Sequence, residues 1–251
     1  MGVQRTKVGL IVAEAQAVQV LAHRGASRAE RENTVAAFAR AHTMGADGVE
    51  LDVRRTADDM LVVHHDARLA DQRIIREVTS VDIASNELTA HIPTLDQALD
   101  ACAGMWVNLE IKNDESEPDF DPTEWVADQT MALLDRRGES ERWLMSSFRI
   151  ETVDRCRAMA PHVRTAWLTG AVPDDIVEML TTRGHVAVHP WVHLLTREMI
   201  ETCHRGHILV NTWTCDDPDR MRELIEWGID GICTNVPDVA LEVRAASIAG
   251  T

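Results

Sequence analysis

Short apolar runs alternate with longer amphipathic stretches along most of the chain. Eight runs have strand length, and they occupy residues 18–22, 48–53, 105–111, 143–148, 164–168, 185–189, 208–213 and 231–234. Between them, apolar residues recur at helical spacing over residues 32–42, 93–101, 123–137, 151–159, 174–182, 196–204 and 219–227. Strands that alternate with helices predict a parallel sheet with helices packed against it.

Eight strands that mostly alternate with helical segments predict an α/β fold, a single (β/α)8 TIM-type barrel. A further apolar arm at residues 60–63 follows the second strand and predicts a small β-hairpin extension there. A doubly wound open sheet is the alternative. The barrel is favoured because polar side chains follow the strands at their C-terminal ends, and because no G-x-G-x-x-G motif supports a dinucleotide fold.

The limits of the barrel follow from the same pattern. We expect residues 1–17 to form an N-terminal arm or an extra helix and residues 18–245 to form the barrel domain. Thr94 is the expected cap of the helix that begins near Pro93. The polar connection between the hairpin arm and Pro93 is too short for a sizeable inserted domain.

Composition is that of an ordinary globular protein, with 45% hydrophobic and 26% charged residues. Five scattered cysteines without a C-x-x-C spacing indicate reduced thiols in a cytoplasmic protein. The first residues make a poor signal peptide, and no apolar run reaches the length of a membrane span. The oligomeric state is not predicted by these patterns.

The formal net charge of −16 disfavours binding to nucleic acid or to anionic membranes. A small anionic substrate would therefore need a local positive site. Arg24, Lys112 and a bound metal ion are the groups that could supply it.

Three carboxylates are candidate metal ligands. Glu50 and Asp52 alternate with apolar residues, so they share one face of a strand, and Glu110 ends a later strand. An all-oxygen set suits a hard cation such as Mg²⁺ or Ca²⁺ rather than zinc. The alternatives are a solvated strand edge for the first pair and an ion pair with Lys112 for Glu110.

Histidines supply candidate acid and base groups, because imidazole titrates near neutrality. His23 ends the first strand and His65 follows the hairpin arm, whereas His64 is expected to face away. A second set, His185, His189 and His193, has the four-residue spacing of zinc ligands on a helix. That segment has the pattern of a strand, and Pro190 would break a helix, so zinc is not expected there.

An ordered series of motifs covers nearly the whole chain. The motifs are HRG at 23–25, ENT at 32–34, GADGVELDVRRTADD at 45–59, VVHHD at 62–66, IPTL at 92–95, LEIK at 109–112, SSF at 146–148, NTWT at 211–214 and GIDGICTNVP at 228–237. In this order and spacing they resemble the glycerophosphodiester phosphodiesterase family.

The resemblance implies roles for matching positions. It implies His23 and His65 as catalytic residues and Glu50, Asp52 and Glu110 as ligands of one divalent cation. Four further residues are expected near substrate: Arg24, Lys112, Glu32 and Trp213. For Glu32 a helix N-terminal role is the alternative, and for Trp213 burial in the barrel.

Three positions depart from the family pattern. Arg31 stands where Pro usually precedes E-N-T, Asp59 where Gly is common in the hairpin, and Asn235 where Asp often follows Thr. The first two affect turn geometry. Asn235 lies near the expected active face, so it bears on substrate preference.

The resemblance implies metal-dependent hydrolysis of glycerophosphodiesters to an alcohol and sn-glycerol 3-phosphate, with one histidine as acid and the other as base. One alternative is a phospholipase D-like cleavage of lysolipids on the same barrel. Another is a catalytically silent phosphodiester-binding protein. The alcohol of the substrate and the choice between water and a substrate hydroxyl as nucleophile stay open.

Overall fold

The computed structural model describes residues 18–249. Its strands are β1 (Gln19–His23), β2 (Gly48–Arg55), β3 (Leu61–Val63), β4 (Trp106–Ile111), β5 (Trp143–Ser147), β6 (Arg164–Thr169), β7 (Ala187–Pro190), β8 (Leu209–Thr212) and β9 (Gly231–Thr234). Its α-helices are α1 (Val35–Met44), α2 (Ser80–Ser85), α3 (Leu95–Ala101), α4 (Trp125–Arg137), α5 (Ile150–Met159), α6 (Ile176–Arg183), α7 (Arg197–Arg205), α8 (Pro218–Glu226) and α9 (Pro237–Ala249).

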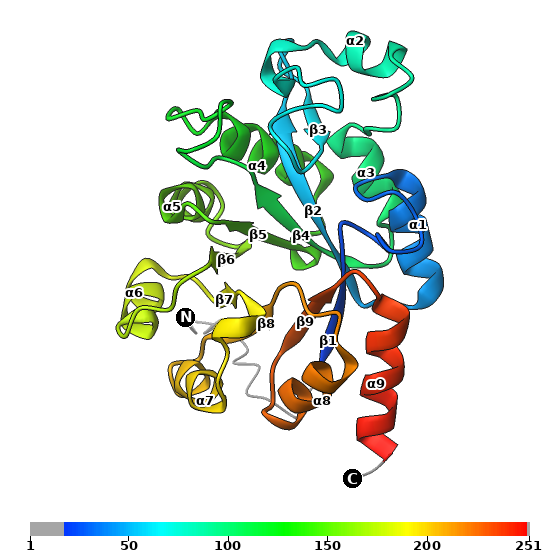
Figure 1. The fold of residues 1–251 in the computed structure, drawn as a ribbon. Coiled ribbons are helices and arrows are strands. Elements are labelled where there is room, and N and C mark those ends of the chain that lie inside the picture. The colour runs from blue at the N-terminus through cyan, green and yellow to red at the C-terminus, as the bar shows by residue number, and fades with distance from the viewer. Residues whose placement is uncertain (1–17, 250–251) are drawn as a thin grey trace, which may run out of the picture.

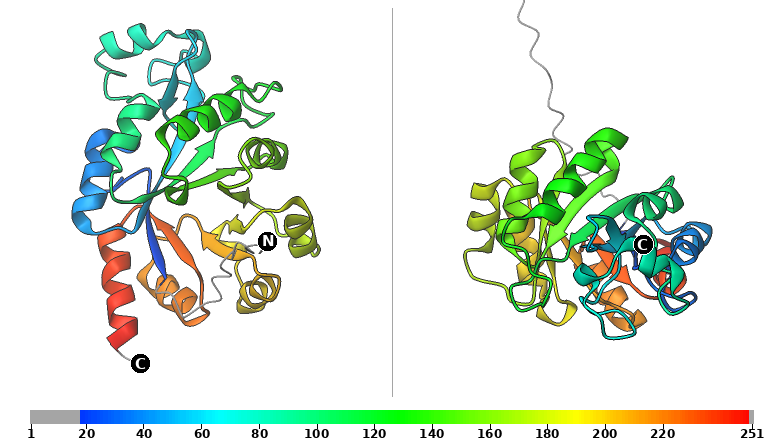
Figure 2. Two further views of the ribbon diagram at one scale, coloured as in Figure 1. Left: turned by 180° about the vertical axis from the view of Figure 1, so that it is seen from behind. Right: turned by 90° about the horizontal axis from the view of Figure 1, so that it is seen from above.

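The sheet closes on itself. Its strand order is β1-β9-β8-β7-β6-β5-β4-β2-β3, and β1 also pairs with β2. Every pairing is parallel except that of β2 with β3, so eight parallel strands form the barrel and β3 is the hairpin arm. Helices surround the strands (Figures 1 and 2). The predicted barrel and hairpin are confirmed, and the open sheet is excluded.

Side chains of the barrel strands alternate between two environments. On β2, Val49, Leu51 and Val53 belong to a fully buried cluster that includes helix residues such as Phe38 and Leu95. The intervening residues Glu50 and Asp52 point to the inside of the barrel, in register with His23 of β1 and Glu110 of β4 respectively. A strand period of two therefore brings polar residues from separate strands together.

Threonine side chains begin several helices. Thr34, Thr94 and Thr196 each accept a hydrogen bond from the backbone N–H three residues on. Thr94 also forms a capping box with Gln97, as its predicted capping role requires.

Two segments differ from the prediction. The connection after β3 is not merely polar, because it forms α2, which lies at the same end of the molecule as β3 (Figure 1), and contributes to a small apolar core. This core consists of Val62, Leu69, Ile75, Val78, Ile83 and Ile92. Helix α9 was also not predicted, and Arg244 on it donates to the Val18 carbonyl and pairs with Asp47.

The predicted N-terminal arm, residues 1–17, lies outside the described residues. All five cysteines are buried and free. Between residues 18 and 249 no helix combines the length and apolar character needed to cross a membrane.

Candidate active site

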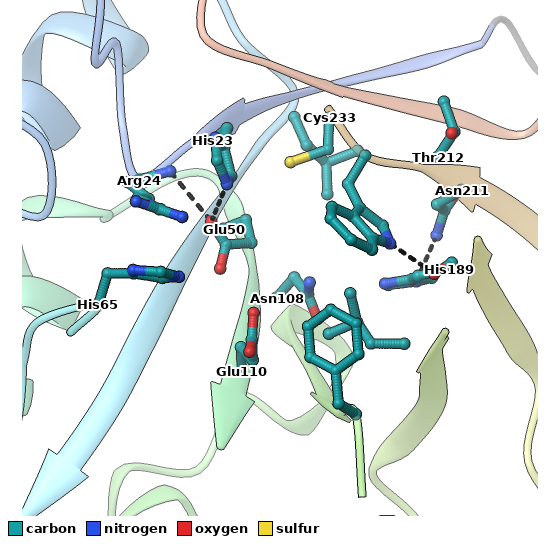
Figure 3. Close-up of a pocket in the computed structure, with 14 residues that line it drawn as sticks. His23, Arg24, Glu50, His65, Asn108, Glu110, His189, Asn211, Thr212 and Cys233 are labelled. Carbon is teal, nitrogen blue, oxygen red and sulfur yellow. Dashed lines mark hydrogen bonds and ion pairs between the residues drawn. The ribbon is translucent and has the colours of Figure 1, made fainter. Parts of the chain in front are cut away.

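A pocket opens at the C-terminal ends of the barrel strands (Figure 3). Polar and apolar side chains from most of the strands line it: Leu21, His23, Arg24, Glu50, His65, Asn108, Glu110, Phe148, Leu168, His189, Asn211, Thr212, Trp213 and Cys233. This is the face on which TIM-barrel enzymes build their active sites.

The three predicted carboxylates lie together. Glu50, Asp52 and Glu110 each offer an oxygen within 4.8 Å of the others, and the three residues are 4%, 1% and 7% exposed. No other cluster of this kind occurs among residues 18–249. Glu50 Oε1 and Asp52 Oδ1 are buried and have no hydrogen-bond partner among residues 18–249. Unpartnered buried carboxylate oxygens fit a hard divalent cation, which would satisfy them.

The pKa values of Glu50 and Asp52 are shifted in opposite directions. Burial, together with the negative charges of Asp52 and Glu110, raises the pKa of Glu50 well above its usual range. Burial also acts to raise the pKa of Asp52, but the positive charges of Lys112 and Arg24 outweigh it and leave that pKa lowered. The cluster therefore holds more negative charge than its neighbours balance, which favours a bound cation.

Two cations border the carboxylates. Lys112 Nζ lies 2.8 Å from Glu110 Oε1 and 3.8 Å from Asp52 Oδ1, so the ion pair considered as the alternative for Glu110 is present. Arg24 Nε lies 3.4 Å from Asp52 Oδ2. Both cations stand where they could also contact a bound phosphate.

The turn after β1 shapes the Arg24 side of the site. Arg24 has a positive φ of 56° and its backbone N–H donates to Glu50 Oε2 at 3.1 Å. Gly25 follows with φ 81°, and a Cβ there would lie 2.6 Å from the Ala37 carbonyl carbon. Only glycine fits this position, which explains the H-R-G sequence.

His23 is held in one tautomer. Its Nδ1 lies 2.7 Å from Asn235 Oδ1, and the amide of Asn235 donates to Asp216 Oδ2 at 2.7 Å, so the carbonyl oxygen faces the imidazole. Nδ1 therefore carries the proton, and Nε2 is directed toward Glu50 Oε2 at 3.9 Å. Burial and the charge of Arg24 lower the pKa of His23, which favours its neutral form.

His65 lies below Arg24, to the left of Glu50 and Glu110 (Figure 3). Its Nδ1 donates to Asp66 Oδ1 at 2.7 Å, and its side chain is 33% exposed. His64 faces a different groove, which Arg68 and Glu117 also line. The two histidines predicted as acid and base thus share one pocket, and the adjacent histidine does not enter it.

Comparison with known proteins agrees with this geometry. The model of the glycerophosphoryl diester phosphodiesterase family matches residues 23–239. The chain belongs to the glycerophosphoryl diester phosphodiesterase family. The predicted family is confirmed, and with it the enzyme class, a phosphoric diester hydrolase.

Relatives of this phosphodiesterase family span nearly the whole chain. The uncharacterised protein YqiK of Bacillus subtilis is 30% identical over 242 residues, covering 88% of this chain and 96% of the relative. A glycerophosphodiester phosphodiesterase of Caldanaerobacter subterraneus is 29% identical over 239 residues, covering 89% and 96%. The solved structure of an Oleispira antarctica phosphodiesterase with the product sn-glycerol-3-phosphate has a TM-score of 0.83 at 23% identity, covering 90% and 96%, and supports the fold.

The remaining predicted residues of this family member have clear positions. Glu32 accepts from Arg24 at 2.9 Å but does not line the pocket. Trp213 does line it, edge-on to Phe148 with ring centroids 5.2 Å apart, and its Nε1–H donates to the His189 carbonyl at 2.7 Å.

The histidines spaced by four do not form a cluster. His185 lies against Asp154, whereas His189 lies inside the barrel and accepts from Asn211 Nδ2 at 3.0 Å. Burial lowers the pKa of His189 to about 3, so it stays neutral. His185 precedes β7, His189 lies on this strand and His193 follows it, so the four-residue spacing does not put the three side chains on one helix face.

Sequence reasoning missed three partners in the site. Asn33, in the quoted E-N-T motif, donates from Nδ2 to Asp52 Oδ2 at 2.7 Å. Asp66, the last residue of the V-V-H-H-D motif, pairs with His65. Asn235, a departure from the family pattern, was expected to bear on substrate preference and not to contact His23. Its contact with His23 spans 212 residues of sequence, so no local signal reveals it.

We expect Asn235→Ala to lower kcat by about 10- to 100-fold, the range typical of residues that orient a functional histidine. Without the amide oxygen, His23 Nδ1 loses its acceptor and both tautomers become accessible. Steady-state kinetics measure the effect, and Asn86→Ala, outside the pocket, serves as the control. An unchanged kcat in Asn235→Ala would show that the contact does not orient the imidazole.

Glu50→Gln is expected to stabilise the metal-free fold, with a gain that grows as pH rises. The folded pKa of Glu50 lies above its unfolded value. At a pH below the pKa of Glu in the unfolded chain, about 4.3, the Glu50 carboxyl is neutral in the folded and the unfolded state, so it does not change the free energy of unfolding. As the pH rises toward the pKa of Glu50 in the folded state, the unfolded chain releases this proton more readily than the folded chain does. The wild type therefore loses stability, whereas the Glu50→Gln variant, which has no proton to release there, does not.

Urea unfolding in EDTA at pH 4 and pH 8 measures this difference. Glu178→Gln, an exposed substitution on α6, is the control and should show no pH-dependent gain. An equal gain for Glu50→Gln at both pH values would contradict the prediction.

Proposed function

We propose that this protein hydrolyses glycerophosphodiesters to an alcohol and sn-glycerol 3-phosphate, using a divalent cation together with His23 and His65. The observation that carries the proposal is a pocket lined by His23, His65, Arg24, Glu50 and Glu110. Asp52 completes the carboxylate cluster beside it, and Lys112 is paired with Glu110. The family match and the Oleispira relative with its sn-glycerol-3-phosphate product support the substrate class.

Glu50, Asp52 and Glu110 would hold the cation, either Mg²⁺ or Ca²⁺. When bound there, it supplies positive charge that stabilises the negative charge developing on the phosphate oxygens. Arg24 lines the pocket and Lys112 lies against Glu110 and Asp52, and both would bind the phosphate oxygens directly. Their charges also offset the anionic surface that a net charge of −16 produces.

The tautomer of His23 supports a role as the base. With its Nδ1 proton donated to Asn235, the Nε2 lone pair can accept a proton from the attacking hydroxyl. The new P–O bond forms as the bond to the alcohol breaks, and His65 would give the departing oxygen its proton. The acceptor of the first proton and the donor of the second are thus different residues.

A change of leaving group tests these two roles. A 4-nitrophenyl diester of glycerol 3-phosphate releases a phenolate that needs no proton, whereas glycerophosphocholine releases an alkoxide. His65→Ala should lose much more activity on glycerophosphocholine than on the nitrophenyl diester, and His23→Ala should lose activity on both. The opposite pattern would exchange the two roles, and equal losses in both variants would refute the assignment.

The substrate class has its own test. Purified protein should release glycerol 3-phosphate from glycerophosphocholine, and a lysolipid with the same head group should turn over more slowly. A strong preference for the lysolipid would replace the proposed reaction with a phospholipase D-like one. Inactivity on both with every metal tried would favour a silent binding protein. Location in the cytoplasm and lack of nucleic-acid binding stay predictions.

A further inference from the structure

Arg54 is a fully buried cation just beyond the carboxylate cluster. It lies on β2, two residues after Asp52, and its side chain is 0% exposed. Its guanidinium is not among the groups that line the pocket, and sequence analysis gave it no role. Burying a guanidinium is costly unless all its donors are engaged, so its partners indicate what the position requires.

Those partners join three separate segments. Arg54 Nε and one terminal nitrogen donate to the His65 backbone carbonyl at 2.9 and 2.6 Å. The same terminal nitrogen pairs with Glu117 Oε2 at 2.7 Å, and the other pairs with Asp119 Oδ2 at 2.6 Å. The guanidinium therefore ties the backbone of His65 to β2 and to the acidic loop that follows Lys112.

The carbonyl that Arg54 holds belongs to His65 itself. The preceding N–H, of His64, donates to the Asp52 carbonyl at 3.0 Å. Together these contacts fix the peptide group before His64 and the peptide group after His65 relative to the strand that carries Glu50 and Asp52. The imidazole is partly exposed, and its own side-chain hydrogen bond goes to the neighbouring Asp66, which is itself exposed.

We propose that Arg54 is a positioning residue for His65. By holding the His65 backbone, Arg54 sets the distance between the His65 imidazole and the carboxylate cluster. This inference rests on the proposed function, in which His65 is catalytic. A misplacement of about 1 Å in a reacting group can cost about 10²-fold in rate. A loss of this clamp should therefore appear in kcat rather than in KM.

The adjacent residue provides a matched control. Arg55 pairs with Asp59 and Asp121 and lies over the Trp125 ring at 4.0 Å, but it does not contact His65. Arg55→Gln thus removes an ion-paired arginine from the same strand without touching the clamp. Arg54→Lys keeps the charge beside Glu117 and Asp119 but cannot reproduce the two bonds to one carbonyl.

The experiment is a double-mutant cycle on glycerophosphocholine hydrolysis. Arg54→Lys should lower kcat by about 10²-fold with KM within about twofold, and Arg55→Gln should leave both unchanged. In a His65→Ala background, Arg54→Lys should cause no further loss, because the group it positions is gone. A loss of equal size in both backgrounds would make Arg54 a purely structural residue and overturn the proposal.

Two further results separate failure of the clamp from other causes. If His65→Ala alone retains full activity, the proposed function fails for His65, a result distinct from failure of the clamp. If Arg54→Lys does not fold, Glu117→Gln, which removes one partner of the guanidinium, takes its place in the same cycle. Histidine side-chain NMR should then show a shifted His65 signal and an unchanged His23 signal, and an unchanged His65 signal would refute the proposal.

Discussion

Alanine at His23 or at His65 is expected to lower kcat for glycerophosphodiester hydrolysis by about 10²- to 10⁴-fold, the contribution typical of a positioned acid or base. Neither substitution removes apolar surface from the main core, because both side chains face the pocket. The melting temperature should therefore stay close to that of the wild type. Kinetics at saturating substrate, together with circular dichroism, measure both expectations.

A matched histidine variant separates catalysis from a general effect of losing an imidazole. His42→Ala changes an exposed residue on α1 and should leave kcat unaltered. Comparable losses at His42 and His23 would point to a stability effect. Full activity in His23→Ala would show that His23 takes no part in the reaction and that its contact with Asn235 does not serve catalysis.

The second large effect is expected when a chelator removes the divalent cation. EDTA should abolish activity, and Mg²⁺ or Ca²⁺ should restore it, because Glu50, Asp52 and Glu110 would otherwise face each other with unbalanced charge. Ion binding should also stabilise the fold. At a free concentration one hundred times Kd the gain is about 2.7 kcal/mol, which for a chain of this size raises Tm by roughly 5 to 10 °C.

Melting curves test metal binding independently of activity. Asp52→Asn should lose most of the metal-dependent rise in Tm, whereas Glu178→Gln, on the exposed side of α6, should keep it. A rise that persists in Asp52→Asn would place the ion elsewhere. Full activity in EDTA would contradict metal dependence directly.

Much of the site could be predicted because its elements are local. The period-two pattern of β2 sets Glu50 and Asp52 on one face, and the parallel pairing of β2 with β4 puts that face next to Glu110. The ends of the strands carry His23 and Lys112 to the same side of the barrel. These features depend on alternation and strand direction, which short stretches of sequence already specify.

The small core beside the hairpin was harder to predict. Its members are spread over residues 62–92, where Ile75, Ile83 and Ile92 follow neither a helical nor a strand period. Periodicity identifies only regular elements, so a core assembled from turns is not visible to it.

The sequence by itself determined the barrel, the set of candidate catalytic and metal-binding residues, and the family. The tertiary structure decided how those residues are held: Asn235 against His23 and Arg54 against the His65 carbonyl, with Asp119 as a further partner of the arginine. These contacts join residues up to 212 positions apart. They depend on side-chain directions that exist only after the strands have closed, and hydrogen bonds require that precise geometry.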